Sequence, residues 1–179
     1  MPLDSPTPSS ASQNLSPANA SLQVKTYREG IAQKVGHDLI IDVTNWQGTL
    51  VLNGASSISI DADSGSLQVR EGHNGVKPLS DKDRGEIVKN IDSKVLRKQP
   101  ISFRSTQVER GASSLAVQGN LSIGETTRPV QCELTIEGGR VKGIITLTQR
   151  EFGIKPYSAM MGALKVRDDI EIVIDAPLA

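Results

Sequence analysis

Apolar and polar residues alternate one by one along much of this chain, and this alternation constrains its fold more than any other feature. It is the spacing at which successive side chains point to opposite faces of a β-strand. In one such run, Cys132, Leu134 and Ile136 alternate with polar residues. The same alternation occurs in residues 39–43, 50–52, 58–60, 115–123, 141–147 and 170–174. Strands buried on both faces of a parallel sheet read as continuous apolar runs, so the alternation favours an antiparallel barrel or sandwich.

Short turn sequences separate the alternating runs. Asn53-Gly54 and Gly138-Gly139 each lie between two of them, as tight connections between antiparallel strands require. About eight strands can be counted, and a closed barrel of eight strands has an interior that holds side chains or one small ligand. We therefore expect an all-β fold built on an eight-stranded antiparallel barrel.

One stretch departs from the alternation. Between Ser80 and Lys98 the apolar residues fall at helical spacing, and Ser80 with Asp83 makes a start that resembles a capping box. Pro100 follows and stops the pattern. We expect one helix here, in a long connection between strands. It either covers a mouth of the barrel or packs against its outside, because its apolar stripe must be buried in both cases.

Residues 1–20 differ from the rest of the chain in composition. They are rich in Ser, Pro, Ala and Asn and have no apolar run, so they bury too little surface to offset the entropy lost on ordering. We expect a disordered tail over residues 1–20 and one β-barrel domain over residues 21–179. The tail lacks the basic start and apolar run of a signal peptide, and no apolar run approaches the roughly 20 residues of a membrane-spanning helix. We expect a cytoplasmic protein without an integral membrane segment.

The charges and the reactive residues exclude several functions. Basic and acidic residues both number 20 and are interspersed, and aromatic residues make up 3% of the chain, whereas nucleic-acid binders carry basic stripes and aromatic platforms. His37 and His73 are too few and too separated for a multi-histidine metal site, and Cys132 alone cannot form a thiolate zinc cluster. The motifs of nucleophile elbows, zinc proteases and phosphate-binding loops do not occur. We expect no nucleic acid, metal, cofactor or catalytic activity.

Several short segments follow one another in a specific order and spacing. They are Trp46-Gln47-Gly48-Thr49-Leu50, Asp83-Arg84, Pro100-Ile101-Ser102-Phe103-Arg104-Ser105-Thr106, Val117-Gln118-Gly119-Asn120-Leu121-Ser122-Ile123, Thr126-Thr127-Arg128-Pro129-Val130 and Arg150-Glu151-Phe152-Gly153-Ile154. Taken together, they make residues 22–176 resemble the YceI-like domain family. The resemblance implies a lipocalin-like, eight-stranded barrel with a helix in a long connection, enclosing an apolar tunnel. Members of that family are associated with binding polyisoprenoids such as isoprenoid quinones.

The leading hypothesis is a non-catalytic carrier that holds a long apolar, isoprenoid-like lipid or quinone in the barrel interior. From the parity of each strand, the expected ligand-binding residues are Leu39, Ile41, Leu50, Leu52, Phe103, Leu121, Leu134 and Phe152, with Met160 and Met161 near a mouth. The two methionines form either a lid or ordinary packing at the barrel end. The alternative is a filled barrel that acts through its outer surface as a protein-interaction or stress-related module. A continuous cavity above about 300 Å³ favours the carrier. The sequence leaves the oligomeric state open, with a homodimer among the options.

Overall fold

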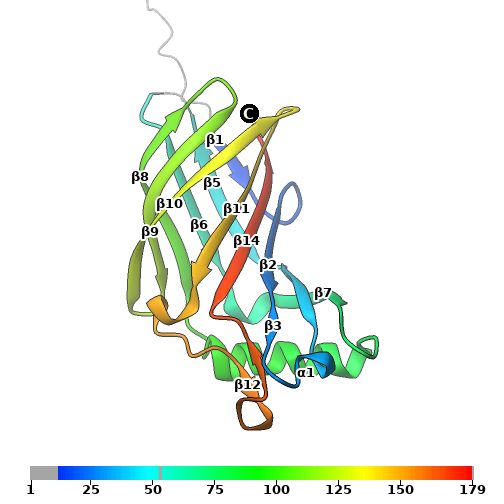
Figure 1. Cartoon of the computed structure of the whole chain (residues 1–179). Coiled ribbons are helices and arrows are strands. Elements are labelled where there is room, and N and C mark those ends of the chain that lie inside the picture. The colour runs from blue at the N-terminus through cyan, green and yellow to red at the C-terminus, as the bar shows by residue number, and fades with distance from the viewer. Residues whose placement is uncertain (1–11, 53, 179) are drawn as a thin grey trace, which may run out of the picture.

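The computed structural model describes residues 12–52 and 54–178. Within these residues, an eleven-stranded and a three-stranded antiparallel sheet form. In spatial order, the larger sheet contains β1 (Ser12–Leu15), β5 (Trp46–Val51), β6 (Ser57–Ala62), β8 (Ile101–Arg110), β9 (Ser114–Ile123), β10 (Thr126–Glu137), β11 (Arg140–Thr148), β14 (Asp169–Pro177), β2 (Ser21–Thr26), β4 (Asp38–Val43) and β7 (Leu67–His73). Figure 1 shows that this sheet is strongly curled, so that one of its faces encloses an interior.

The smaller sheet and the helix lie together at one end of the curled sheet, at the bottom of Figure 1. The small sheet consists of β12 (Ser158–Ala159), β13 (Leu164–Val166) and β3 (Arg28–Glu29). Helix α1 (Asp81–Asn90) runs across this end and continues into a π-helical turn, η3 (Ile91–Val95). Of the two positions that the sequence allowed, the helix therefore takes the one at the mouth.

The expectation of an antiparallel all-β fold with one helix is confirmed, but the count of eight strands is not. The described residues form eleven strands in the main sheet, and its end strands, β1 and β7, pair with β5 and β4 and not with each other. Strands β1, β2 and β7 were the hardest to recognise from alternation, because each carries at most two apolar residues. The result is a curled open sheet in place of the expected closed barrel.

The end of the expected N-terminal tail belongs to the fold, which corrects the prediction of disorder for residues 12–20. Strand β1 pairs with β5, and Leu15 is buried in the core. The following turn is held by Asn19, whose side chain accepts a hydrogen bond from the Ser16 N–H and donates one to the Asn14 carbonyl, both at 2.9 Å. Residues 12–20 bury little apolar surface, but they gain order from strand pairing and from the hydrogen bonds of this turn. Residues 1–11, the remainder of the expected tail, lie outside the described residues.

The start of helix α1 has the expected capping box. The Asp83 N–H donates to the Ser80 hydroxyl at 3.1 Å, and the Ser80 N–H donates to the Asp83 carboxylate at 3.0 Å. These two bonds satisfy N–H groups that have no partner within a helix. The first helical turn is thereby fixed at the edge of the mouth. The regular helix ends at Asn90, earlier than the expected Lys98, because a π-helical turn replaces its last part.

The end of the curled sheet away from the helix is filled by side chains. Leu50, Leu115, Val141 and Ala176 are all at least 96% buried there and belong to one continuous core. Interiors packed in this way leave no voids for a ligand. Any binding space must therefore lie between this packed region and the helix.

Candidate ligand-binding cavity

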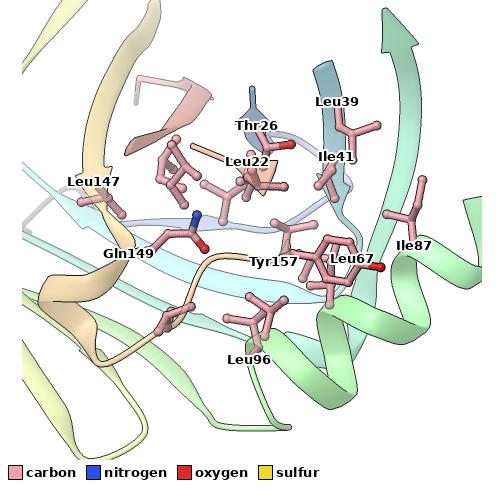
Figure 2. A pocket seen from close by; sticks show the side chains of 18 of the residues that line it. Leu22, Thr26, Leu39, Ile41, Leu67, Ile87, Leu96, Leu147, Gln149 and Tyr157 are labelled. Carbon is pink, nitrogen blue, oxygen red and sulfur yellow. The ribbon is translucent and has the colours of Figure 1, made fainter. Parts of the chain in front are cut away.

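A cavity of about 660 Å³ lies inside the curled sheet, between the packed core and helix α1. Cavities of about 300–1,000 Å³ are typical of small-molecule sites. Its wall is formed mostly by aliphatic side chains from β2, β4, β6, β7, β8, β9, β10, β11 and β14. Figure 2 shows part of this wall, with Leu22, Leu39, Ile41 and Leu147 around the space. The volume exceeds the threshold of about 300 Å³ that separates a carrier from a filled barrel.

Strand register explains why the wall is continuous. Ile145 of β11 lies opposite Ile172 of β14, Ile172 lies opposite Val24 of β2, and Val24 lies opposite Ile41 of β4. Directly opposite residues in adjacent strands point to the same face of a sheet. All four side chains line the cavity. Four strands thus present one uninterrupted apolar band to the interior.

Helix α1 and its π-helical extension close the mouth with their apolar stripe. Ile87, Ile91 and Val95 are spaced four residues apart, and all line the cavity together with Leu96. Figure 2 shows Ile87 and Leu96 on the helical side of the space. Arg84 fastens the helix to the edge strand β7, because its guanidinium donates to the carbonyls of residues 69 and 70 at 3.3 and 3.0 Å.

A few polar groups line the end of the cavity near the helix. Gln149, directly after β11, is 94% buried, and its side-chain amide donates to the Arg167 carbonyl at 2.9 Å. Thr26 and Tyr157 also line the cavity, and Figure 2 shows the Tyr157 ring across the space from Gln149, beside Leu67. His37 contacts the Lys77 carbonyl at 2.5 Å from its Nε2. The cavity therefore combines a hydrocarbon-like interior with hydrogen-bonding groups near the mouth.

One ionisable group sits within the apolar part. Cys132 lines the cavity, and burial raises the pKa of its thiol. A raised pKa keeps the thiol protonated at neutral pH, and a protonated thiol is a poor nucleophile. Cys132 thus behaves as an apolar wall residue.

Half of the residues expected to bind the ligand lie on the cavity wall. They are Leu39, Ile41, Phe103, Leu121 and Leu134. They come from β4, β8, β9 and β10. The structure brings these five side chains together around one space.

The other five expected residues do not line the cavity. Leu50 and Phe152 are both 96% buried in the hydrophobic core, and Leu52 packs against that core. Alternation shows that Leu50 faces the interior, but it does not show whether Leu50 lies beside the cavity or in the filled part of the interior. Phe152 lies in a 3₁₀ turn, η4 (Gln149–Phe152), where strand parity does not apply. Met160 and Met161 face solvent, with 60% and 106% relative exposure.

Residues 14–178 match the model of one protein family, described as the YceI-like domain. The chain belongs to this family. The resemblance seen in the sequence is thereby confirmed. None of the curated proteins compared with the chain matches it.

The fold of this YceI-like protein is similar to that in the crystal structure of Burkholderia cenocepacia BcnA. The TM-score is 0.61 at 13% sequence identity, and the match covers 87% of this chain and 94% of BcnA. At such low identity, the similarity supports the fold alone. It agrees with the curled antiparallel sheet described above.

The sequence also contained signals for wall residues that were not named. Val24, Ile145 and Ile172 each lie on the same face of their strand as other apolar residues. The apolar stripe that includes Ile87 was expected to be helical, but the sequence did not show whether it faced the cavity. Gln149 carried no signal, because it follows the end of a strand. Residues of this kind become visible only once the chain is folded.

Residues 12–52 and 54–178 contain no group of three or more His, Cys, Asp or Glu side chains arranged to hold a metal ion. None of the helices formed by these residues has the length and apolar character needed to cross a membrane.

Proposed function

We propose that this YceI-like protein binds and carries a long apolar, isoprenoid-like lipid in the interior of its curled sheet, without catalysing a reaction on it. The observation that carries the proposal is the apolar cavity of about 660 Å³ between the packed core and helix α1. The association of the family with polyisoprenoids supports the chemical class of the ligand. The mostly aliphatic wall supports the non-catalytic part, because the acidic and basic side chains among the lining residues, such as His37, Asp83 and Glu86, lie toward the helix end.

Burial of hydrocarbon supplies the binding free energy. Removing apolar surface from water is worth about 25 cal/mol per Å², and this gain needs no specific partner atoms. The band formed by Ile145, Ile172, Val24 and Ile41 offers such an environment without a break. A flexible prenyl chain can fill an irregular space of this kind.

The polar groups near the mouth favour a ligand with a polar head, such as an isoprenoid quinone. A side-chain amide has two N–H groups, and the Gln149 amide uses one of them on the Arg167 carbonyl. Its second N–H is a donor suited to a quinone oxygen, and the Tyr157 hydroxyl is a separate donor on the cavity wall. In this arrangement the head lies near helix α1 and the tail extends toward the packed core.

Native mass spectrometry with lipid extraction tests the proposal. We expect a prenyl compound to co-purify with the protein, and the delipidated protein to take up an added prenyl quinone. The Ile172→Phe variant places a larger side chain in the middle of the wall, so it narrows the cavity and should reduce uptake of the prenyl quinone. Ile144→Phe, on the 60% exposed outer side of β11, is the matched control and should leave uptake unchanged. If the wild-type protein holds no lipid and takes up no prenyl compound, the carrier function is refuted.

A further inference from the structure

The large apolar side chains that remain exposed are concentrated around the mouth of the cavity. Among the described residues, six large apolar side chains are exposed, and five of them lie in three loop segments at the helix end. These five, which we call the apolar rim, are Ile31, Val35, Val76, Met160 and Met161. Apolar patches on a protein surface commonly mark a partner or membrane contact.

Backbone hydrogen bonds hold the three segments, residues 30–36, 74–79 and 155–166, against one another. The Ala32 N–H donates to the Ala163 carbonyl at 2.8 Å, and the Val76 N–H donates to the Lys34 carbonyl at 3.0 Å. Figure 1 shows the hairpin of β12 and β13 projecting beyond helix α1 at this end. The three segments that carry the apolar rim therefore lie side by side at one end of the molecule.

Met160 and Met161 are exposed and lie in an unusual backbone conformation. Their φ angles are 54° and 56°, in the left-handed region that residues other than glycine adopt only at an energetic cost. Met161 is fully exposed, and Met160 is more than half exposed. A flexible, unbranched thioether suits insertion into a fluid, irregular environment.

The charge of the three segments points to the nature of the partner. They contain Lys34, Lys77, Lys155 and Lys165 and no acidic residue. Lys165 lies opposite Glu29 in the small sheet, so its charge is partly balanced. Three lysines next to exposed apolar side chains remain. The exposed acids Asp81, Asp83 and Glu86 at the same end lie on helix α1 and not in these segments. Interfacial membrane-binding surfaces combine these two properties, since apolar groups enter the acyl boundary while basic groups attract anionic headgroups.

The same segments form part of the cavity wall. Val35 belongs to the apolar rim and also lines the cavity, and Lys77, Tyr157 and Leu164 line it from the other two segments. A surface that contacted a bilayer here would turn the mouth toward the lipid. A hydrocarbon ligand could then enter or leave without crossing water.

We propose that the apolar rim docks this protein on the surface of a membrane that contains anionic lipids, with the mouth of the cavity facing the bilayer. Docking requires only the rim and its lysines, so it goes beyond the carrier function and does not depend on the ligand. Together with the carrier function, docking would allow lipid to pass between the bilayer and the cavity.

Vesicle flotation tests the docking. We expect the wild-type protein to float with vesicles of phosphatidylcholine mixed with phosphatidylglycerol, and less with phosphatidylcholine alone. Replacing both rim methionines (Met160→Ser with Met161→Ser) should weaken binding about tenfold or more, because two apolar side chains no longer enter the membrane. Lys34→Gln and Lys155→Gln should each weaken it about fivefold.

Two control variants lie on β11, away from the rim. Ile144→Ser removes the sixth exposed apolar side chain, and Lys142→Gln removes an exposed lysine from the same strand. Both should bind vesicles like the wild type. Docking is refuted if the wild-type protein does not float, or if the controls weaken binding as much as the rim variants. It is also refuted if the rim mediates self-association, seen as a concentration-dependent dimer that the methionine variant loses while vesicles stay unbound.

Lipid content measured on the same samples separates the two proposals. Neither Met160 nor Met161 lines the cavity, so the methionine variant should retain its lipid in solution. Retained lipid without vesicle binding by the wild-type protein refutes docking and leaves the carrier function standing. Vesicle binding by a wild-type protein that holds no lipid would support docking and refute the carrier function.

Discussion

Gln149 donates a hydrogen bond from its side-chain amide to the backbone carbonyl of Arg167 at 2.9 Å, and this bond orients a buried polar side chain on an otherwise apolar wall. Figure 2 shows the amide directed into the cavity between Leu147 and Tyr157. A polar group fixed in this position can distinguish a ligand with a polar head from a plain hydrocarbon.

The Gln149→Leu variant should bind a prenyl quinone about threefold to tenfold more weakly, the effect of losing one hydrogen bond. Its affinity for a prenyl hydrocarbon of similar length should change much less, since the added side chain is apolar. Titration of the delipidated variant with both ligands measures the difference. Equal weakening for both ligands would show that Gln149 acts through the shape of the cavity and not through the head group.

Gly119 allows the Phe103 ring to pack closely over β9. A Cβ atom at Gly119 would lie 2.5 Å from the Phe103 ring and 2.5 Å from the Arg104 carbonyl oxygen. Gly119→Ala should therefore lower the free energy of unfolding by about 1–3 kcal/mol, as overpacking does. It should also reduce lipid uptake, because Phe103 lines the cavity and must shift.

The matched control for Gly119 is Gly85 in helix α1. A Cβ atom at Gly85 meets nothing within 4 Å. Gly85→Ala should raise the free energy of unfolding by about 0.5–1 kcal/mol through helix propensity. Urea unfolding of both variants measures the two effects, and a loss of stability in both would contradict the packing argument.

The capping box at Ser80 should control how firmly the mouth is closed. Ser80→Ala removes the bond to the Asp83 N–H and should lower the free energy of unfolding by about 1 kcal/mol. Because Ile87 and Ile91 close the mouth from the same helix, a loosened helix start should also speed the release of bound lipid. Stopped-flow transfer to acceptor vesicles measures the rate, and Ser57→Ala, an exposed serine on β6, is the control. Unchanged release from a destabilised Ser80→Ala protein would show that the helix start does not gate the mouth.

Much of the fold was predictable because alternation acts locally. Ile145 and Ile172 lie in runs long enough to assign an inward face, and the structure places both on the cavity wall. The start of helix α1 was predictable for a similar reason, since Ser80 and Asp83 satisfy each other within one turn. Such features depend on a few neighbouring residues.

The features that escaped prediction depend on distant parts of the chain. Leu50 has the parity of a wall residue, but it lies where the core of the curled sheet is filled. Strand β1 contains one apolar residue, and pairing with β5 is what orders it. Met160 and Met161 have the composition of a lid, and only their exposure in the folded chain shows that they point outward.

Asp38 should make the stability of the mouth depend on pH. Partial burial by itself raises the pKa of Asp38, but hydrogen bonds from the Arg28 N–H at 2.9 Å and the Asn74 amide at 2.7 Å, with the Arg28 charge, lower it overall. A carboxyl group whose pKa is lowered by folding stabilises the protein above its unfolded pKa of about 3.9 and loses that effect as the pH falls through the folded value. Asp38→Asn should therefore be less stable than the wild type at about pH 6, and the difference should shrink as the pH falls below about 3.9. Urea unfolding across this range measures the convergence, with Glu125→Gln in the exposed turn after β9 as the control. A difference in stability that stays constant over the whole pH range would show that Asp38 stabilises its contacts with Arg28 and Asn74 by packing and not through its charge.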